Sequence, residues 1–464
     1  MAVLAAAACQ PPDTRCRNDG DCDTTVRYCA ANGTCQPLAG RPGGSIPARC
    51  TVYGAQPGSS SAAGAALVVG ALLPRTRADG AEDPRGRLRE QAARLVVEEL
   101  NPPQRQGVAG RSLALVSCDT AGDATTAAAL AGDLVELGAL AIISAGSAET
   151  LAASAVTIPA GVLLISSSAT TPELTDLPDL PAGGGAGLVW RTAASDAFQG
   201  AVLSSLLTDG NLCGLGGTGA ASAAVIYLDD PYGQGLYTVF SRHFTRTEAG
   251  FLYARAGSID TALAAAAAAN PAALVVIGFP DDVTRILDAT VGTSLGAVPL
   301  FLTDSARNPA LFTLAHPERL AGACGTAPAP ADTTSAAYDW FGQQYQQKFG
   351  EDPLSASFVP NTYDAMMLIA LAAAWALQPG RTLNGAALAE GLRHLSAVDG
   401  GTAVNLDVPS FNTAVSRLAA GGDLDVQGTS GPLDFDNATG EAPAAVQVWE
   451  AADGGFTTLR VVQP

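Results

Sequence analysis

The stretch ALAIISAGSAETLAASAVTIPAGVLLISSSATTPELT, residues 139–175, contains the pattern on which the fold prediction rests. Two short apolar runs, 139–146 and 161–168, flank a segment of helical length, and each run ends in small polar residues. Strands that are apolar on both faces and joined through a helix are typical of a parallel sheet covered by helices. We therefore expect a strand, a helix and a second parallel strand here.

The same alternation extends along the chain in both directions. Further apolar runs, each bounded by turn-forming residues, lie at 66–74, 112–119, 223–230, 273–280 and 298–305. The sequence therefore predicts an α/β protein with doubly wound parallel sheets. A chain of 464 residues is long enough to form two or three separate cores.

Composition limits the possible partners. The formal net charge is −19, and such an acidic surface repels nucleic acid and anionic membranes, so we expect neither as a direct partner. The longest apolar run, residues 365–377, is shorter than the roughly 18 to 20 residues that a membrane-spanning helix needs. We expect this run to form a buried helix and the partner to be a small molecule or another protein.

The first nine residues, MAVLAAAAC, are similar to the lipobox of bacterial lipoproteins, in which small residues precede a cysteine that receives a lipid. We predict lipidation at Cys9 and a signal remnant at 1–9. No basic region precedes the apolar stretch, and Leu4 is not three residues before the cysteine, so an accidental match is the alternative. A lipid anchor would hold the protein in the periplasm or at the cell surface.

Eight cysteines remain after Cys9, an even number that suits an oxidising compartment. Residues 10–49 contain four of them and few apolar residues, so we expect a small module held by disulfides. Zinc is the alternative, but paired C-x2-C knuckles are absent from the sequence. The four are Cys16, Cys22, Cys29 and Cys35, and their pairing stays open. Residues 50–65, rich in Gly, Pro, Ser and Ala, predict a flexible linker.

Polar residues follow the predicted strands, where parallel sheets bind ligands and helix N-termini present free N–H groups. They are Asp119, Ser147, the cluster 166–171, residues 229–232 and Asp304. Helix capping is the competing interpretation for each hydroxyl, because Ser and Thr are common N-caps. Two hydroxyl-bearing segments on neighbouring strand ends favour a ligand.

Four further motifs follow in order beyond residue 175: VWRTAASDAFQGAVL, VIYLDDPYGQGLYTVF, NTYDAMMLIALAAAWA and GTSGPLDFDNATGE. With these motifs, residues 66 to 464 resemble the type I periplasmic binding proteins, specifically the leucine/isoleucine/valine-binding branch. The resemblance implies two α/β lobes joined by a multi-strand hinge, which close on a small ligand and deliver it to an ABC transporter permease. We assign 66–195 and 327–430 to the first lobe and 196–326 and 431–464 to the second, and we expect a monomer without a cofactor.

In the first lobe the resemblance implies that Ser147 and the segment Ser168, Ala169 and Thr170 bind a ligand α-carboxylate. We call these residues the carboxylate hook. Arg85 falls where relatives that bind aliphatic ligands carry an aromatic residue. If Arg85 points into the cleft, its guanidinium favours a polar or acidic ligand side chain. A solvated position on the charged loop 75–89 is the alternative.

In the second lobe the resemblance implies that Tyr232 faces the ligand. Phe279 falls where the relatives carry Tyr, so a hydroxyl contact is missing. Asp304 aligns, with one gap, with the acid that pairs with the ligand ammonium in the relatives. Such a pairing is physically reasonable, because an unpaired charge in a closed cleft is costly. A helix cap is the alternative role of Asp304.

The relatives' first-lobe disulfide is absent, because Gly146 stands at one of its positions. Cys213 and Cys324 both fall in the implied second lobe, and we expect them to pair. Cys50 and Cys118 then remain, and a bridge between them would join the linker to the first lobe.

Motifs of hydrolases, zinc proteases and nucleotide-binding enzymes are absent from the sequence, and its three histidines have no neighbouring Cys or carboxylate at ligand spacing. We therefore expect neither an enzyme nor a metal site. Two functions remain. The first is an amino acid transport component that binds an amino acid or similar zwitterion. The second is an envelope sensor or protein-interaction lipoprotein with the same fold.

Overall fold

The computed structural model describes residues 27–29, 35–37 and 46–464, except 62, 78, 79, 103, 182, 183, 256, 314, 315, 398 and 399. Two short strands, β1 (Arg27–Cys29) and β2 (Cys35–Pro37), pair antiparallel in the predicted Cys-rich module. The predicted lipidation of Cys9 and the pairings of Cys16, Cys22, Cys29 and Cys35 lie outside the described side chains.

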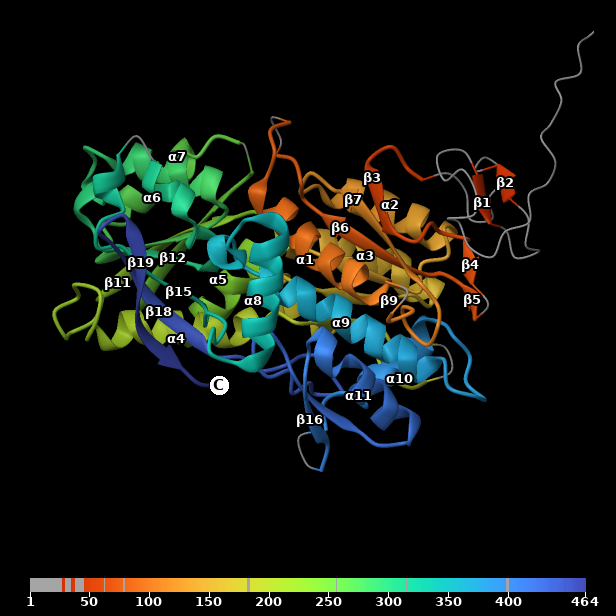
Figure 1. Ribbon diagram of the computed structural model, residues 1–464. Coiled ribbons are helices and arrows are strands. Elements are labelled where there is room, and N and C mark those ends of the chain that lie inside the picture. Colours follow the sequence, from red (N-terminus) through yellow and green to blue (C-terminus); the bar gives the residue numbers. More distant parts are fainter. Residues whose placement is uncertain are drawn as a thin grey trace, which may run out of the picture.

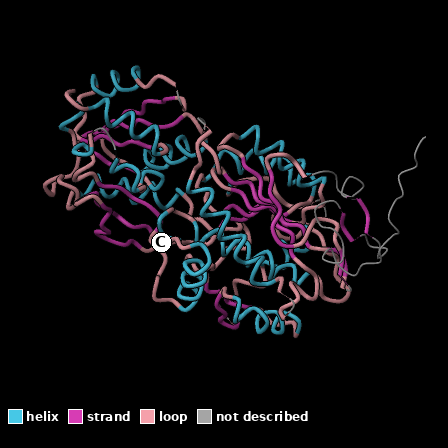
Figure 2. The backbone as a smooth tube through the Cα atoms, turned by 45° about the horizontal axis from the view of Figure 1, so that its top comes forward, coloured by secondary structure: helices cyan, strands magenta, loops and turns pink. Residues whose placement is uncertain are grey.

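The strands form two separate main sheets with helices around each (Figure 2). The first sheet has the order β10-β9-β8-β6-β7-β3, and all its pairs are parallel except the edge pair of β3 and β7. Its strands are β3 (Cys50–Gly54), β6 (Leu67–Leu73), β7 (Leu113–Asp119), β8 (Ala141–Ser144), β9 (Leu163–Ser166) and β10 (Val189–Arg191). The predicted strand, helix, strand unit is therefore confirmed in β8, α3 (Ser147–Ala160) and β9.

The second sheet has the order β12-β11-β13-β14-β15-β18-β19, with the pairs of β15, β18 and β19 antiparallel. Its strands are β11 (Ser222–Leu228), β12 (Thr247–Tyr253), β13 (Ala273–Ile277), β14 (Leu300–Leu302), β15 (Cys324–Pro328), β18 (Val446–Ala452) and β19 (Gly455–Val462). Two minor sheets pair β4 (Ser60–Ser61) with β5 (Gly64–Ala65), and β16 (Thr402–Asn405) with β17 (Leu424–Gln427).

Helices cover both faces of each main sheet, which makes each lobe doubly wound (Figure 1). The first lobe contains α1 (Pro84–Leu100), α2 (Ala124–Glu136), α3, α8 (Ala336–Phe349), α9 (Val359–Ala376), α10 (Gly385–Leu392) and α11 (Val408–Ala419). The second lobe contains α4 (Asp196–Asp209), α5 (Pro231–His243), α6 (Asp260–Ala268) and α7 (Pro280–Thr290). The apolar run 365–377 lies mostly in α9, which is buried almost all round, as predicted. Within the described ranges no helix is long and apolar enough to span a membrane.

The chain crosses between the lobes after β10, after β15 and between β17 and β18. A buried ion pair between Arg191 and Glu441 joins the first crossing to the last, and the Arg191 backbone N–H donates to the Gly440 carbonyl oxygen at 3.0 Å. The lobes are therefore connected by several strands of chain rather than by one flexible tether.

The prediction of a flexible linker over 50–65 is wrong for its first residues. Cys50–Gly54 forms β3, the edge strand of the first sheet, in register with β7 so that Cys50 lies opposite Cys118. These two cysteines form a disulfide, and Cys213 bonds to Cys324, so both predicted pairings are confirmed. The composition of the whole segment concealed the strand, because the Gly and Ser residues that follow it dominate the average.

Candidate ligand-binding site between the lobes

The strand ends of the two lobes face each other, and we call the region between them the cleft. Helix α5 of the second lobe contacts α3 and the short 3-10 helix η3 (Pro172–Leu174) of the first. The Thr170 hydroxyl donates to Asp196 Oδ2 at 2.8 Å, and an Arg255 Nη atom lies 3.4 Å from the Gly122 carbonyl oxygen. The lobes are therefore closed on each other.

The predicted carboxylate hook comes together at the ends of β8 and β9. Ser147 is buried at the start of α3, and its Oγ accepts a hydrogen bond of 3.3 Å from the Thr171 backbone N–H. Ser168 Oγ accepts from the Gly146 backbone N–H at 3.2 Å. Gly146, at φ 70°, is the N-cap of α3, so the capping role expected of Ser147 is not observed. Of the hydroxyls at Ser147, Thr170 and Thr171, that of Thr171 alone caps a helix, because it accepts from the Glu173 N–H at the start of η3.

Arg89 extends this hook, and sequence reasoning missed it. Its Nη1 donates to Ser168 Oγ at 3.1 Å, and its Nε donates to the Ser357 carbonyl oxygen at 3.1 Å. Burial lowers the pKa of the Arg89 guanidinium to about 10, which leaves it charged at neutral pH. Among the described residues no carboxylate forms an ion pair with it. A buried, unpaired cation therefore lies beside the serine hydroxyls.

Arg85 lies one helical turn before Arg89 on α1 and is engaged by its own N-cap. Its Nε and Nη2 donate to the two carboxylate oxygens of Asp83, at 3.0 and 2.7 Å. The guanidinium also lies 5.9 Å from the centre of the Phe279 ring in the second lobe. The side chain is 27% exposed, so Arg85 is neither a solvated loop residue nor a free cation.

Tyr232 and Asp304 form the second-lobe side of the cleft. The Tyr232 hydroxyl donates to Asp304 Oδ1 at 2.7 Å and lies 2.8 Å from Thr303 Oγ1. Gln199 Nε2 also donates to Asp304 Oδ1, at 3.0 Å. Asp304 opens the 3-10 helix η5 (Asp304–Ala306), whose N-cap is Thr303, so Asp304 is not its cap.

Asp196 is a second buried acid that sequence reasoning missed, although it directly follows the first crossing in the quoted motif VWRTAASDAFQGAVL. It is completely buried, and its Oδ1 has no hydrogen-bond partner within the described part of the chain. Burial raises the pKa of Asp196 well above its ordinary value, and the neighbouring carboxylate of Asp304 raises it further. Burial also raises the pKa of Asp304. Two close acids that resist ionisation suit a cationic group placed between them.

Aromatic rings line the same space. Phe279 lies 5.5 Å from the Tyr232 ring and 4.3 Å from the Arg255 guanidinium. Phe358, the N-cap of α9, has φ 66°, a conformation uncommon for a large side chain, and lies 5.4 Å from Arg89. Such strain persists where surrounding contacts impose it, often at ligand sites.

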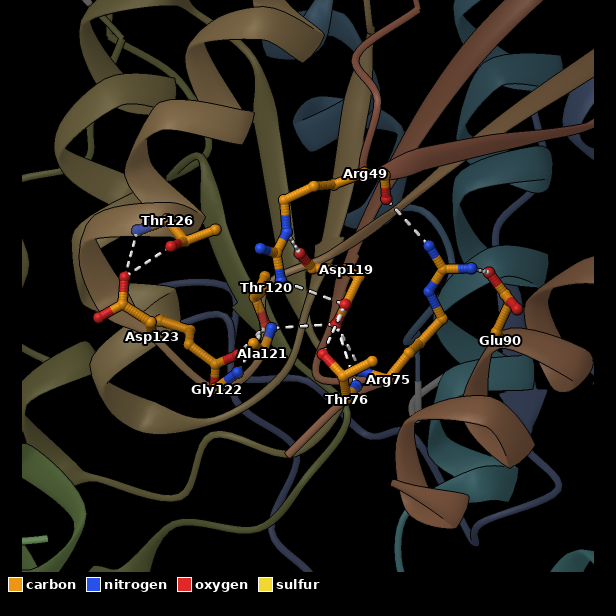
Figure 3. A network of polar contacts seen from close by, with 11 residues as sticks. Arg49, Arg75, Thr76, Glu90, Asp119, Thr120, Ala121, Gly122, Asp123 and Thr126 are labelled. Atoms are coloured by element: carbon orange, nitrogen blue, oxygen red, sulfur yellow. Dashed lines mark hydrogen bonds and ion pairs between the residues drawn. The ribbon is translucent and has the colours of Figure 1, made fainter. Parts of the chain in front are cut away.

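Asp119, the polar residue at the end of β7, is not available to a ligand. Its carboxylate accepts from the backbone N–H groups of Arg75, Thr76 and Ala121 and pairs with Arg49 at 3.2 Å (Figure 3). Burial raises the pKa of Asp119, but the Thr76 hydroxyl, which donates to Oδ2 at 2.7 Å, and the three backbone N–H groups hold it below its usual value. Asp119 therefore fastens the loop after β6 and the residues before β3 to the end of β7.

The two sides of the cleft carry different polar groups. Within the residues that the structure describes, no cluster of three His, Cys, Asp or Glu side chains could hold a metal. Hydroxyls and a guanidinium on the first lobe face carboxylates on the second, which suits a small molecule that carries both charges.

Two parallel-sheet lobes around such a cleft define a bilobal ligand-binding protein. The model of the periplasmic binding protein family matches residues 66–455, and the chain belongs to this family. The substrate-binding protein BasB of a chemotactic signal transduction system in Halobacterium salinarum is 25% identical over 412 residues, which cover 86% of this chain and 91% of BasB.

Solved structures show the same fold. The leucine-binding protein LivK from Thermotoga maritima has 21% identity and a TM-score of 0.67, over 86% of this chain and 99% of that one. The branched-chain amino acid transporter substrate-binding protein LivJ from Streptococcus pneumoniae, in complex with isoleucine, has 20% identity and a TM-score of 0.65, over 86% of this chain and 100% of that one. The type I periplasmic binding protein fold predicted from the sequence is confirmed.

Proposed function

We propose that this protein is an extracytoplasmic solute-binding protein that captures an amino acid or similar small zwitterion between its lobes and delivers it to an ABC transporter permease. The observation that carries the proposal is the position of an unpaired cation and an unsatisfied buried acid on opposite sides of the cleft. Among the described residues, Arg89 has no acidic partner on one side, and Asp196 Oδ1 has no donor on the other. A zwitterion would satisfy both, since buried charges are stable only when paired.

The ligand carboxylate would accept from Arg89, the hydroxyls of Ser147 and Ser168, and the backbone N–H group of Thr170. The Ala169 N–H already donates to Ser166 Oγ at 3.0 Å, so Ala169 would contact the ligand only through its methyl group. The ligand ammonium would donate to Asp196 and Asp304. Tyr232 and Phe279 would flank the ligand, and Arg85, held by Asp83, would lie near its side chain. We place Tyr232 and Arg85 together with Phe279 because both side chains contact the Phe279 ring.

Thermal unfolding of the full chain, unfolded and refolded to remove bound solute, against amino acids, amides, ureas and small carboxylates tests this proposal. A ligand at about 100 times its Kd adds roughly 2.7 kcal/mol, a shift of a few degrees. The shift should disappear in Ser147→Ala, Arg89→Gln and Asp304→Asn. Arg94→Gln, which removes a surface cation paired with Glu98, is the matched control. A hit that survives all three substitutions would place the ligand elsewhere.

A sensor that presents the loaded protein to a signalling receptor is the second candidate, and the similarity to BasB favours it. Co-purification of the loaded and empty protein with membrane proteins separates the two functions, because the transport function requires an ABC permease as the captured partner. We retain a lipid anchor at Cys9 as part of either function. Fatty acid labelling of the protein in cells, lost in Cys9→Ser, would support it, and labelling that persists would exclude it.

A further inference from the structure

A cavity adjoins the cleft on the side of the crossings between the lobes. Its volume is about 890 Å³, within the range of small-molecule sites, and we name it the side chamber. Its walls come from the crossings after β15 and before β18, the 3-10 helices η6 (Pro309–Thr313) and η8 (Pro353–Ser355), the start of α9, and the β18–β19 hairpin. Asp304 and Phe358 line it and also belong to the cleft. Gln463 and Pro464 also line the chamber, and the C-terminal end lies near the junction of the lobes (Figure 1).

The lining of the side chamber is mostly apolar. Its larger apolar side chains are Phe312, Leu354, Phe358, Leu433, Phe456 and Val461. Several prolines of the crossings add rigid walls. A cavity of this character releases ordered water when an apolar body fills it, which favours binding.

Arg307 is the one lining cation. Its Nε is buried without a hydrogen-bond partner, and its guanidinium forms no ion pair within the described ranges. Its guanidinium carbon lies 5.7 Å from the centre of the Phe456 ring. Arg191, by contrast, has Glu441 as its acidic partner. An unpaired, partly desolvated guanidinium next to an apolar wall matches the two ends of an amphipathic anion.

The acids that line the chamber do not neutralise Arg307. Asp304 accepts from Tyr232 and Gln199 on the cleft side. Asp332 accepts from the backbone N–H and the hydroxyl of Thr334. Neither these acids nor Asp434 lies within ion-pair distance of Arg307 among the described contacts. The guanidinium therefore remains available to an incoming anion.

We propose that the side chamber is a second binding site, for a small organic carboxylate with an apolar body, whose carboxylate pairs with Arg307. The apolar body lies against Phe312, Phe358 and the prolines of the crossings. Because the chamber has walls from both lobes, its occupant contacts both lobes and changes the affinity of the cleft for its own ligand. This site does not require that the cleft ligand be a zwitterion.

Calorimetric titration of the full chain with benzoate and octanoate tests the proposal, with octanol and octylamine as probes that lack the anion. We expect at least one carboxylate to bind, and Arg307→Gln to weaken it about tenfold or more. Arg460→Gln removes an exposed cation from β19 and should leave the affinity unchanged. Ala329→Trp, which narrows the chamber and keeps Arg307, should also weaken binding.

The outcomes separate the two sites. Ser147→Ala should abolish an amino acid hit and leave carboxylate binding in place. If no carboxylate binds the wild type, or if both Arg307→Gln and Ala329→Trp bind as the wild type does, the side chamber is not a binding site. Loss of carboxylate binding in Ser147→Ala but not in Arg307→Gln would show that the probe occupies the cleft, and it would overturn the proposal.

Discussion

The hydroxyl of Thr170 in the first lobe donates a hydrogen bond of 2.8 Å to Asp196 Oδ2 in the second. This bond joins the proposed carboxylate-binding residues of the first lobe to the acids that face them, so the two halves of the candidate site lie within one network. Ligand charge and lobe closure are therefore expected to depend on each other, because the same groups serve both.

Asp196→Asn should separate stability from binding. At neutral pH the substitution removes a buried carboxylate whose pKa is raised, so the free energy of unfolding of the empty protein should be unchanged or higher. Affinity for the cleft ligand should fall about tenfold or more, because a charge-assisted hydrogen bond to the ammonium is lost. Urea unfolding and calorimetry measure the two effects. If the wild type and the variant bind the cleft ligand with equal affinity, Asp196 does not contact that ligand.

Glu149 should make stability depend on pH. It is buried in the first turn of α3, accepts from Thr120 Oγ1 at 2.5 Å, and burial raises its pKa to about 7. The folded state therefore holds this proton more tightly than the unfolded state. The stabilising contribution is complete below the ordinary pKa of 4.5 and is lost as the pH rises through about 7.

Glu149→Gln should therefore reduce the loss of stability between about pH 5 and about pH 8 in urea unfolding, by on the order of 1 to 3 kcal/mol. Glu136→Gln, an exposed acid on α2, is the control and should leave the pH dependence unchanged. Parallel pH curves for wild type and Glu149→Gln would show that Glu149 has an ordinary pKa.

The ion pair of Arg191 with Glu441 should stabilise the hinge. Glu441→Gln leaves a buried guanidinium without its acid, although Nη1 still donates to the Thr171 carbonyl oxygen at 2.7 Å. Removing one partner of a buried pair costs roughly 3 to 5 kcal/mol, and we expect a loss near the lower figure because Glu441 is partly exposed. Urea unfolding measures it. A loss no greater than that of Glu390→Gln, which breaks an exposed pair, would contradict the assignment.

The local parts of this architecture follow from the sequence, and the non-local parts do not. Apolar runs and the polar residues after them locate β8, β9 and the hook, because strand ends and helix starts are set by neighbouring residues. Strand β3 was hidden, since its order depends on pairing with β7 and on the bridge from Cys50 to Cys118. The predicted bridge from Cys50 to Cys118 indicated this partner, but the composition of residues 50–65 did not indicate a strand.

The charged residues of the site also divide into those that the local sequence reveals and those that only the folded chain brings together. Asp304 and Ser147 are recognisable because each follows a strand directly. Arg89 lies inside a helix, and only the packing of α1 against the residues before α9 brings it to Ser168. The ion pair of Arg85 with Asp83 is local in the sequence, but an Asp two residues before an Arg at a helix start is equally compatible with two solvent-exposed side chains. Burial, which decides between these possibilities, is a property of the folded chain.

The absence of a side chain at Gly235 should be needed for closure of the lobes but not for the stability of either lobe. It lies in α5, and a Cβ at this position would be 2.8 Å from Thr171 Oγ1 and 3.1 Å from Pro172 Cδ, both in the first lobe. Gly235→Ala should therefore oppose the closed arrangement and weaken ligand binding about tenfold or more, as the ligand must offset the clash. Stability of the empty, open protein should hold or rise by up to about 1 kcal/mol, because Ala favours a helix over Gly.

Gly132→Ala, in α2, provides the control, because a Cβ there would meet no atom within 4 Å. It should gain the same helical stability and keep full affinity. Small-angle scattering of Gly235→Ala with saturating ligand should show a larger radius of gyration than the loaded wild type. If Gly235→Ala binds and compacts as the wild type does, the contact of α5 with Thr171 does not form on closure, and the ligand would be held chiefly by one lobe.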